Sequence, residues 1–283
     1  MRLDGKIVLI TGSTDGVGRR VAERLGAMGA HVLVHGRNRA RGEALVDELR
    51  KAGGQAAFYQ ADFSSLAEVR GLAGAVRKDH GRLDVLINNA GLGSGAARTR
   101  QTSADGHELL FSVNYLAGFL LTALLLPLMR AAAPARIVNV ASAGQERIDF
   151  GDVMLTRNYS GGRAYRQSKL AQILFTMDLA EALKETGITV TCLHPSTFMN
   201  TTMVRQAGTT PLSTVDDGAD AILNLAIAPE TEGRTGLYFN VLREARADSQ
   251  AYDAEARAKL RELSLELTGA PEPAPSRPAR GQV

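Results

Sequence analysis

Residues 6–18 read KIVLITGSTDGVG, a short apolar run that leads directly into a turn with three glycines. The run is rich in Val and Ile and predicts a buried strand, and the residues after Gly16 predict an amphipathic helix that ends before Gly29. Gly12, Gly16 and Gly18 therefore lie between a strand and a helix N-terminus. Glycines in this position let the backbone approach a pyrophosphate, and the helix end faces the anion. The alternative is an ordinary strand-to-helix turn, because a glycine trio alone is a weak signal.

The same alternation continues along the chain. Short Val- and Ile-rich runs alternate with longer amphipathic segments, and the first six runs lack a clean period of two, which favours strands covered on both faces. The pattern predicts one doubly wound α/β domain with a mostly parallel seven-stranded sheet and helices on both faces. Strands are expected at 6–12, 31–36, 56–62, 84–91, 135–142, 188–195 and 236–240. Helices are expected at about 16–28, 38–52, 65–81, 116–129, 164–186 and 248–269.

The chain divides into one large domain and a short tail. Residues 1–268 contain the predicted elements without an internal linker, whereas 269–283 are rich in Pro, Ala and charge and lack an apolar period. Such a composition predicts a disordered C-terminal tail.

Composition excludes several classes of protein. The net charge of +3 is spread over 283 residues, with basic residues interleaved with acidic ones, so we expect no nucleic-acid partner. Cys192 is the only cysteine, which fits a reducing compartment, and we expect a cytoplasmic location. The apolar stretch 116–129 contains Pro127 and is shorter than a membrane span, so we predict a buried helix there and a homo-oligomer that uses it. The five histidines have no metal-ligand spacing, and no metal is expected.

The residues after the second predicted strand indicate the kind of dinucleotide. An acidic residue there would accept the ribose hydroxyls of NAD, but this chain has Arg37 and Asn38. A cation without a competing acid suits a 2′-phosphate, so NADP is expected in preference to NAD. Asp15, within the glycine turn, works mildly against a phosphate, and a solvated surface arginine is the alternative role for Arg37.

Two other strand ends carry polar residues. Asp62 could accept a hydrogen bond from an adenine amino group or cap the following helix, a role that Ser64 could also take. The sequence NNAG at 88–91 predicts a tight backbone crossing beside the cofactor, or a plain turn.

Four motifs occur together in an order that resembles the short-chain dehydrogenase/reductase family. They are TGSTDGVG at 11–18, NNAG at 88–91, Ser142 at a strand end, and Tyr165 and Lys169 in YRQSK at 165–169. The resemblance covers about residues 4–268. The segment SKLAQILF at 168–175 and the long gap between Ser142 and Tyr165 resemble the retinol-dehydrogenase-like branch.

The resemblance implies a Rossmann fold and hydride transfer between NAD(P) and an alcohol or carbonyl. It implies that Tyr165 is the acid/base, that Lys169 binds the nicotinamide ribose and lowers the tyrosine pKa, that Ser142 holds the substrate oxygen, and that Asn114 takes part in a water-linked proton relay. A satisfied core amide is the alternative for Asn114. Cofactor contacts are expected from Gly12, Ser13, Thr14, Gly16, Val17, Gly18, Arg37, Asn38, Asp62, Phe63, Asn89, Ala90, Gly91, Tyr165, Lys169, Pro195, Thr197 and Thr201.

The sequence HPST at 194–197 departs from the family pattern, because Ser196 stands where a glycine usually follows the proline. At Ser196 the resemblance therefore does not carry over the family's backbone contact to the cofactor carboxamide. Segments 143–163 and 196–215 are expected to flank the substrate. Their apolar side chains predict an apolar alcohol or carbonyl, although they also contain Arg147, Arg157 and Arg163.

Two alternatives stay open at this point. A sugar-nucleotide epimerase or dehydratase also uses Tyr and Lys four residues apart, but such relatives usually have Gly-x-x-Gly-x-x-Gly and a larger C-terminal substrate domain. A non-catalytic NAD(P)-sensing protein on the same fold is the second alternative, against which Ser142, Tyr165, Lys169 and Asn114 all argue.

Overall fold

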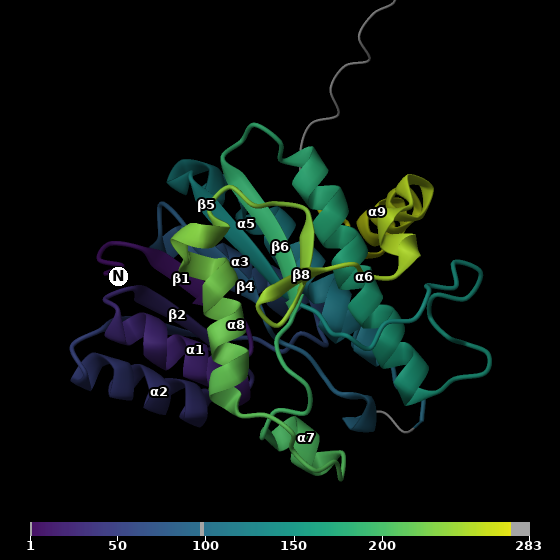
Figure 1. Ribbon diagram of the computed structural model, residues 1–283, viewed down its shortest axis with the longest axis horizontal. Coiled ribbons are helices and arrows are strands. Elements are labelled where there is room, and N and C mark those ends of the chain that lie inside the picture. Colours follow the sequence, from purple (N-terminus) through teal and green to yellow (C-terminus); the bar gives the residue numbers. More distant parts are fainter. Residues whose placement is uncertain (1, 97–98, 273–283) are drawn as a thin grey trace, which may run out of the picture.

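The computed structural model describes residues 2–96 and 99–272, and an eight-stranded sheet runs through its centre (Figure 1). The strand order is β3-β2-β1-β4-β5-β6-β7-β8, and neighbouring strands are parallel except β7 and β8. The strands are β1 (Ile7–Ile10), β2 (His31–Gly36), β3 (Gln55–Gln60), β4 (Val85–Asn88), β5 (Ala135–Val140), β6 (Ile188–His194), β7 (Leu237–Asn240) and β8 (Arg243–Ala245).

Helices cover both faces of the sheet. Helices α1, α2 and α8 pack on one face, α3, α5 and α6 on the other, and α9 lies outside α6 (Figure 1). The helices are α1 (Gly16–Ala27), α2 (Arg39–Lys51), α3 (Leu66–Asp79), α4 (Leu109–Phe111), α5 (Ala117–Ala132), α6 (Gly161–Ala182), α7 (Thr202–Gln206), α8 (Val215–Ile227) and α9 (Ala254–Thr268). Short turns of other helix types are η1 (Ser94–Ala96), η2 (Ser112–Leu116), η3 (Pro229–Thr231) and η4 (Ser249–Tyr252).

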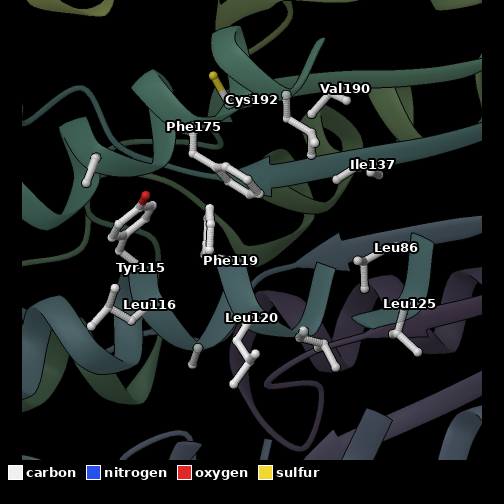
Figure 2. Packing of buried hydrophobic residues seen from close by; sticks show 14 of the residues in the cluster. Leu86, Tyr115, Leu116, Phe119, Leu120, Leu125, Ile137, Phe175, Val190 and Cys192 are labelled. Carbon is white, nitrogen blue, oxygen red and sulfur yellow. The ribbon is translucent and has the colours of Figure 1, made fainter. Parts of the chain in front are cut away.

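Two hydrophobic cores lie on opposite sides of the sheet. Leu9 and Leu33 point into the core under α3, α5 and α6, whereas Val8 and Val32 point into the core under α1, α2 and α8. Figure 2 shows part of the first core, in which Phe119 and Phe175 lie 5.1 Å apart between their ring centroids. Because successive residues of one strand are buried on opposite faces, the strands are apolar throughout, which explains their missing period of two.

The predicted fold class and single domain agree with this architecture, and the doubly wound α/β fold is confirmed. The sheet has one strand more than the seven predicted: β8 is three residues long, exposed and antiparallel to β7, and so has no apolar signal. Helix α6 begins at Gly161, capped by Ser160, three residues before the predicted start. The predicted tail at 269–283 falls mostly outside the described residues, which end at 272.

The apolar helix predicted at 116–129 is longer than expected. Helices α4, η2 and α5 form one continuous helix, Leu109–Ala132, with a mean hydropathy of 2.1 over its most apolar window. Length and composition alone would allow this helix to cross a membrane, but 83% of that window is buried inside the protein. It is therefore the core helix of the domain. The apolar side chains from which we predicted a subunit contact are thus mostly buried within one chain.

Candidate functional site

The glycine turn lies at the carboxyl end of β1, beside that of β4. The chain leaves β1 for β2 on one side, while β4 lies on the other side, so this point is where an open α/β sheet forms its binding crevice. Gly12 has φ +64°, and a Cβ there would lie 2.8 Å from the Cα of Ala90. A Cβ on Gly18 would lie 2.4 Å from Asn89 Nδ2. The turn thus needs glycine for its own packing as well as for any ligand.

The NNAG segment is bonded to this turn. Asn89 donates through Nδ2 to the carbonyls of Thr11 (2.9 Å) and Gly12 (3.1 Å), and Thr11 Oγ1 accepts the N–H groups of Asn89 and Ala90, both at 2.9 Å. On the other side of Ala90, a Cβ added to Gly91 would lie 3.5 Å from Lys169 Nζ. The predicted tight crossing of the backbone is therefore built by side-chain contacts between this segment and the glycine turn.

The N-terminus of α1 is suited to a pyrophosphate. The Asp15 carboxylate caps it by accepting the Gly16 N–H at 2.7 Å, and the first intrahelical bond runs from Arg19 N–H to Asp15 O. The N–H groups of Val17 and Gly18 precede that bond and lack an intrahelical acceptor. Thr201, which caps α7, lies against the same turn: its Cγ2 would be 3.4 Å from a Cβ on Gly16.

Ser13 and Thr14 pack inward from the turn. The Ser13 hydroxyl is fully buried, donates to Ile10 O at 2.8 Å and accepts from His35 N at 3.0 Å. Thr14 packs against Gly36, where a Cβ would meet its Cγ2 at 2.6 Å. The Ser13 hydroxyl therefore holds β1 to β2, and the Ser13 N–H is also used, because it donates to His35 O at 2.9 Å.

His35 supports the turn and was missed in the sequence. Its Nδ1 accepts the Gly12 N–H at 3.1 Å and its Nε2 lies 3.2 Å from Ala61 O, so the proton is on Nε2. Burial lowers its pKa to about 4, which keeps the ring neutral. Phe63 stacks on it at 4.4 Å. The signal available in the sequence was the second histidine of HVLVHG, which follows three apolar residues of the predicted strand.

Arginines gather at the expected position after β2. Asn38 caps α2 by accepting the Arg41 N–H at 3.0 Å, and Arg37 precedes it. Arg37 lies 3.6 Å from a carboxylate oxygen of Asp62, and Arg41, which the sequence interpretation did not include, lies 3.6 Å from Asp15. Asp15, whose negative charge works against a bound phosphate, therefore has the guanidinium of Arg41 beside it.

Asp62 bonds within its own turn. It accepts the Ser64 N–H at 2.9 Å, and the cap of α3 is Ser65, whose hydroxyl accepts from Glu68 N. Neither Asp62 nor Ser64 is thus the helix cap. The second Asp62 carboxylate oxygen faces Arg37.

Ser142, Tyr165 and Lys169 meet at the carboxyl end of β5. Ser142 follows the strand, is buried, and its Oγ accepts the Gly144 N–H at 3.0 Å. Tyr165 and Lys169 share one face of α6, and Lys169 Nζ lies 5.8 Å from the centroid of the Tyr165 ring. Burial raises the Tyr165 pKa, and a hydrogen bond from Ser142 acts in the opposite direction. The three side chains are therefore adjacent, as the resemblance implied.

Lys169 is buried and its ammonium is held by two oxygen atoms. Its side chain is 5% exposed, and Nζ donates to Val140 O and to Gln172 Oε1, both at 2.9 Å. Burial alone lowers its pKa from 10.5 to about 7. Two acceptors leave one N–H of the protonated ammonium for a cofactor hydroxyl.

Asn114 sits in the π-helical turn η2. Its Oδ1 accepts the Leu92 N–H at 2.7 Å, and its Nδ2 donates to Leu92 O at 3.1 Å and to Ser168 Oγ at 3.0 Å. The amide is thus a satisfied buried group that fixes the chain after Gly91. The sequence analysis gave this role as the alternative for Asn114. Its part in a water-linked proton relay stays a proposal.

The segment after β6 tolerates Ser196. Among the described residues, positive φ in this segment occurs at Phe198 (45°) and not at Ser196, so the serine costs no backbone strain. Thr197 is exposed and its Oγ1 lies 3.0 Å from His194 Nε2, while Pro195 is buried between them. His194 therefore orients a predicted cofactor contact.

The segments 143–163 and 196–215, which are expected to flank the substrate, are partly apolar. Leu155 is buried and packs in one cluster with Leu110 and Ala164, against which Tyr159 and Tyr165 also pack. Phe198 and Met203 are exposed, and Met203 contacts the chain at Gly93.

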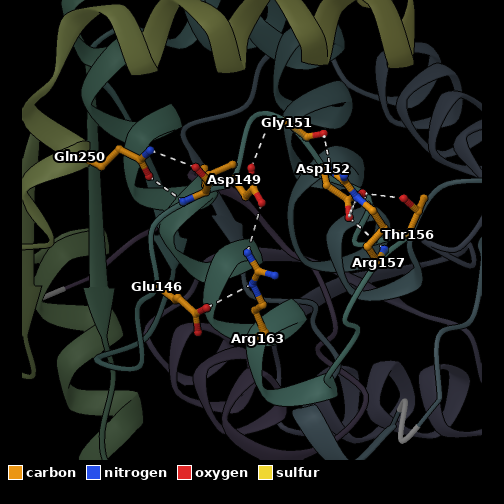
Figure 3. Close-up of polar contacts among 9 residues, drawn as sticks. Glu146, Asp149, Gly151, Asp152, Thr156, Arg157, Arg163 and Gln250 are labelled. Atoms are coloured by element: carbon orange, nitrogen blue, oxygen red, sulfur yellow. Dashed lines mark hydrogen bonds and ion pairs between the residues drawn. The ribbon is translucent and has the colours of Figure 1, made fainter.

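The arginines of these segments make ion pairs. Arg157 pairs with Asp152 at 3.6 Å, and Arg163 pairs with Glu146 at 3.3 Å and Asp149 at 3.4 Å (Figure 3). Arg147 is exposed. In residues 2–96 and 99–272, no group of three His, Cys, Asp or Glu side chains could hold a metal ion.

The arrangement fits a nicotinamide dinucleotide. The tightly packed glycine turn after β1, the N-terminus of α1, and the partly free buried ammonium of Lys169 lie at the carboxyl ends of the central strands. When bound, NAD(P) supplies or accepts a hydride. The chain itself provides a hydroxyl pair, Ser142 and Tyr165, that can hold an oxygen and move a proton to or from it.

Comparison with known proteins agrees with this geometry. A sequence model described as short chain dehydrogenase matches residues 6–211, and the chain belongs to that family of NAD(P)-binding oxidoreductases. Among its relatives, retinol dehydrogenase 14 of Mus musculus is 36% identical, covering 94% of this chain and 87% of that one. Retinol dehydrogenase 12 of Homo sapiens is 34% identical over 95% and 88%. The protein is thus a member of the retinol-dehydrogenase-like branch.

Solved structures give the same fold. An uncharacterized protein from Mycobacterium paratuberculosis has a TM-score of 0.77 and 29% identity, with 95% of each chain covered. The RhlG/NADP active-site complex of Pseudomonas aeruginosa has a TM-score of 0.69 and 28% identity, with 85% of this chain and 96% of that chain covered.

Proposed function

We propose that this protein is an NADP-preferring alcohol dehydrogenase or carbonyl reductase that acts on an apolar substrate. The observation that carries the proposal is the meeting of Ser142, Tyr165 and the buried Lys169 at the carboxyl end of β5. In the reduction direction, the substrate oxygen binds between Ser142 Oγ and the Tyr165 hydroxyl, and the phenol gives its proton to that oxygen as hydride arrives at carbon.

The electrostatics of the site favour this proton transfer. An unperturbed tyrosine has a pKa of about 10. Burial raises the Tyr165 pKa and keeps the phenol protonated, which is the form that donates. Once the proton has left, the ammonium of Lys169 stabilises the phenolate. In the oxidation direction, the positive charge of the oxidised nicotinamide adds to that effect.

The preference for NADP rests on Arg37 and Arg41. Both guanidinium groups lie at the start of α2, where the adenosine ribose binds in such folds, and the nearby Asp15 and Asp62 are each beside one of them. Titration with NADPH and NADH measures the preference. Binding of NADH at least about tenfold tighter than NADPH contradicts it.

The apolar substrate is inferred from the residues that border Tyr165. Leu92, Leu155 and Tyr159 belong to the small cluster that also contains Tyr165, and Arg157 and Arg163 are held by carboxylates. The names of the relatives add retinol as a first compound to test. Turnover of small polar ketones without turnover of retinal, aliphatic or aromatic carbonyls contradicts this part of the proposal.

Removal of the Tyr165 hydroxyl tests the mechanism. We expect Tyr165→Phe to lower turnover by roughly 10²- to 10⁴-fold, because the proton donor is lost, while NADPH still binds. Turnover follows NADPH absorbance, and binding follows NADPH fluorescence. The control is Tyr252→Phe, which removes a hydroxyl that only accepts the Ala247 N–H on the surface. Wild-type turnover in Tyr165→Phe excludes the mechanism and favours the alternative of a non-catalytic NAD(P) sensor.

The second alternative, a sugar-nucleotide epimerase, has less support. Among the described residues, the part of the chain after β6 adds two strands to the same sheet and packs its helices on the same core, and does not form a separate substrate domain. We also keep a small-molecule partner, a cytoplasmic location and a homo-oligomer as proposals. Size-exclusion chromatography measures the oligomeric state.

A further inference from the structure

The ammonium of Lys169 is held only by neutral oxygens. The carbonyl of Val140, at the end of β5, and the side-chain amide of Gln172, one turn further along α6, each accept one hydrogen bond at 2.9 Å. Among the described residues, no carboxylate forms an ion pair with Lys169, and burial is the one cause of its lowered pKa. A neutral acceptor fixes the position of a cation without cancelling its charge.

Gln172 is placed for this contact by the helix. It follows Lys169 by three residues, so both side chains lie on one face of α6, and Gln172 is itself 5% exposed. On α6 itself, Tyr165 lies beside the ammonium. From other elements, Asn114 on η2, Ser142 after β5 and His194 on β6 face this region, and the pKa of His194 is lowered by burial and by the charge of Lys169.

We propose that Gln172 is a positioning residue for Lys169, whose side-chain oxygen holds the ammonium beside Tyr165 while leaving its positive charge available to the Tyr165 phenolate. The proposal rests on the proposed function, because it gives Lys169 its place in the proton transfer. An amide is the suitable group at this position. An apolar side chain would leave the buried ammonium without this acceptor, and a carboxylate would neutralise the charge of the ammonium.

Two substitutions of similar size separate these effects. Gln172→Met removes the oxygen and keeps the length, so the ammonium loses one hydrogen bond and its pKa falls further. Gln172→Glu keeps the oxygen and adds a negative charge, so the pKa of Lys169 rises by about one unit or more. The matched control is Gln167→Met: Gln167 is also buried on α6, but lies about 140° around the helix from Gln172.

The first measurement is the titration of Lys169 in cofactor-free protein, followed by NMR of ¹³C-labelled lysine and assigned with Lys169→Arg. We expect opposite shifts of the midpoint in the two variants and no shift in Gln167→Met. A wild-type midpoint in Gln172→Met or in Gln172→Glu overturns the proposal. If one variant does not fold, the other decides the result.

The second measurement is the pH profile of kcat for alcohol oxidation with NADP. In both variants, less positive charge acts on Tyr165, so its phenolate is less stable. We therefore expect both variants to reach half-maximal kcat only at a higher pH than the wild type. A merely structural role for Gln172 lowers kcat at every pH without moving the profile, and this result also overturns the proposal. Failure of the proposed function gives a different result, namely turnover that survives in Tyr165→Phe. The NMR titration is independent of that result, because it needs neither cofactor nor substrate.

Discussion

At the scale of single residues, the cofactor preference depends on two loosely paired arginines. Arg37 and Arg41 are 63% and 61% exposed, and each lies 3.6 Å from its carboxylate, Asp62 or Asp15. Exposed ion pairs of this kind contribute at most about 1 kcal/mol. The guanidinium groups can therefore leave these carboxylates for a phosphate, which offers more oxygens and a higher charge.

Charge changes at Arg41 and Asp15 test this arrangement. Arg41→Ala should weaken NADPH binding by about tenfold, equivalent to about 1.4 kcal/mol, and leave NADH binding nearly unchanged. Asp15→Asn should strengthen NADPH binding, because asparagine still caps α1 but carries no charge. Fluorescence titration of both cofactors gives the values. Arg39→Ala is the control, since Arg39 pairs with Glu43 on the surface of α2. An equal loss of NADH and NADPH affinity in Arg41→Ala shows that it does not recognise the phosphate.

At the scale of elements, the segment between Ser142 and α6 is anchored to the C-terminal part of the chain. Gln250, in η4, accepts the Ile148 N–H at 2.7 Å and donates to Ile148 O at 3.1 Å (Figure 3). Gln145 donates to Ser142 O at 3.1 Å and accepts the Asp248 N–H at 2.7 Å. The segment that we propose borders the substrate is thus held by contacts about 100 residues apart in sequence.

Loss of the Gln250 side chain should loosen this segment. Gln250→Ala leaves the buried Ile148 N–H and C=O without their partner, which costs about 1–3 kcal/mol for each group. We expect a raised KM for the alcohol or carbonyl substrate and faster amide exchange at Ile148, with NADPH affinity unchanged. Steady-state kinetics and hydrogen exchange measure these quantities. Gln55→Ala, at the exposed start of β3, is the control, and an unchanged KM in Gln250→Ala contradicts the role of η4.

At the scale of the whole molecule, α9 covers the outer side of the helical layer. Arg261 pairs with Asp178 of α6 at 2.6 Å, and Ser264 Oγ lies 2.7 Å from the hydroxyl of the buried Tyr115. Arg70, in α3, donates to the carbonyl of Thr268 at the end of α9. One helix therefore joins α3, η2 and α6 and shields the aromatic core of Figure 2.

Truncation separates the contribution of α9 from that of the residues after it. A chain that ends at Asp253 loses the buried Leu260 and the contacts of α9, so we expect a loss of several kcal/mol, a Tm lower by about 10 °C or more, and self-association through the uncovered face. A chain that ends at Glu272 keeps α9 and should behave as the full chain does. Thermal unfolding and size-exclusion chromatography compare the two, and equal stability of both truncated chains contradicts this role of α9.

Much of the fold could be predicted because its signals are local. Apolar runs, helical periods and glycines at helix ends depend on neighbours within one or two turns, and they located seven of the eight strands and predicted helices on both faces of the sheet, although not α8. The short, exposed β8 has no such signal, since its pairing with β7 gives it its structure. The π-helical turn at Asn114 was missed for a similar reason: its backbone is set by packing and by the bonds to Leu92 and Ser168.

The sequence by itself determined the glycine turn after β1, the strand-end Ser142, and the helix face that carries Tyr165 and Lys169, because each depends on spacing along one element. The tertiary structure alone decided what surrounds them. His35 under the glycine turn and Gln250 against the segment after Ser142 act across segments that are distant in sequence. Gln172 lies only three residues from Lys169, yet its contact matters because β5 and β6 exclude water there. Burial of the ammonium, which sets its pKa near 7, is a property of the packed sheet and helices and not of any single segment.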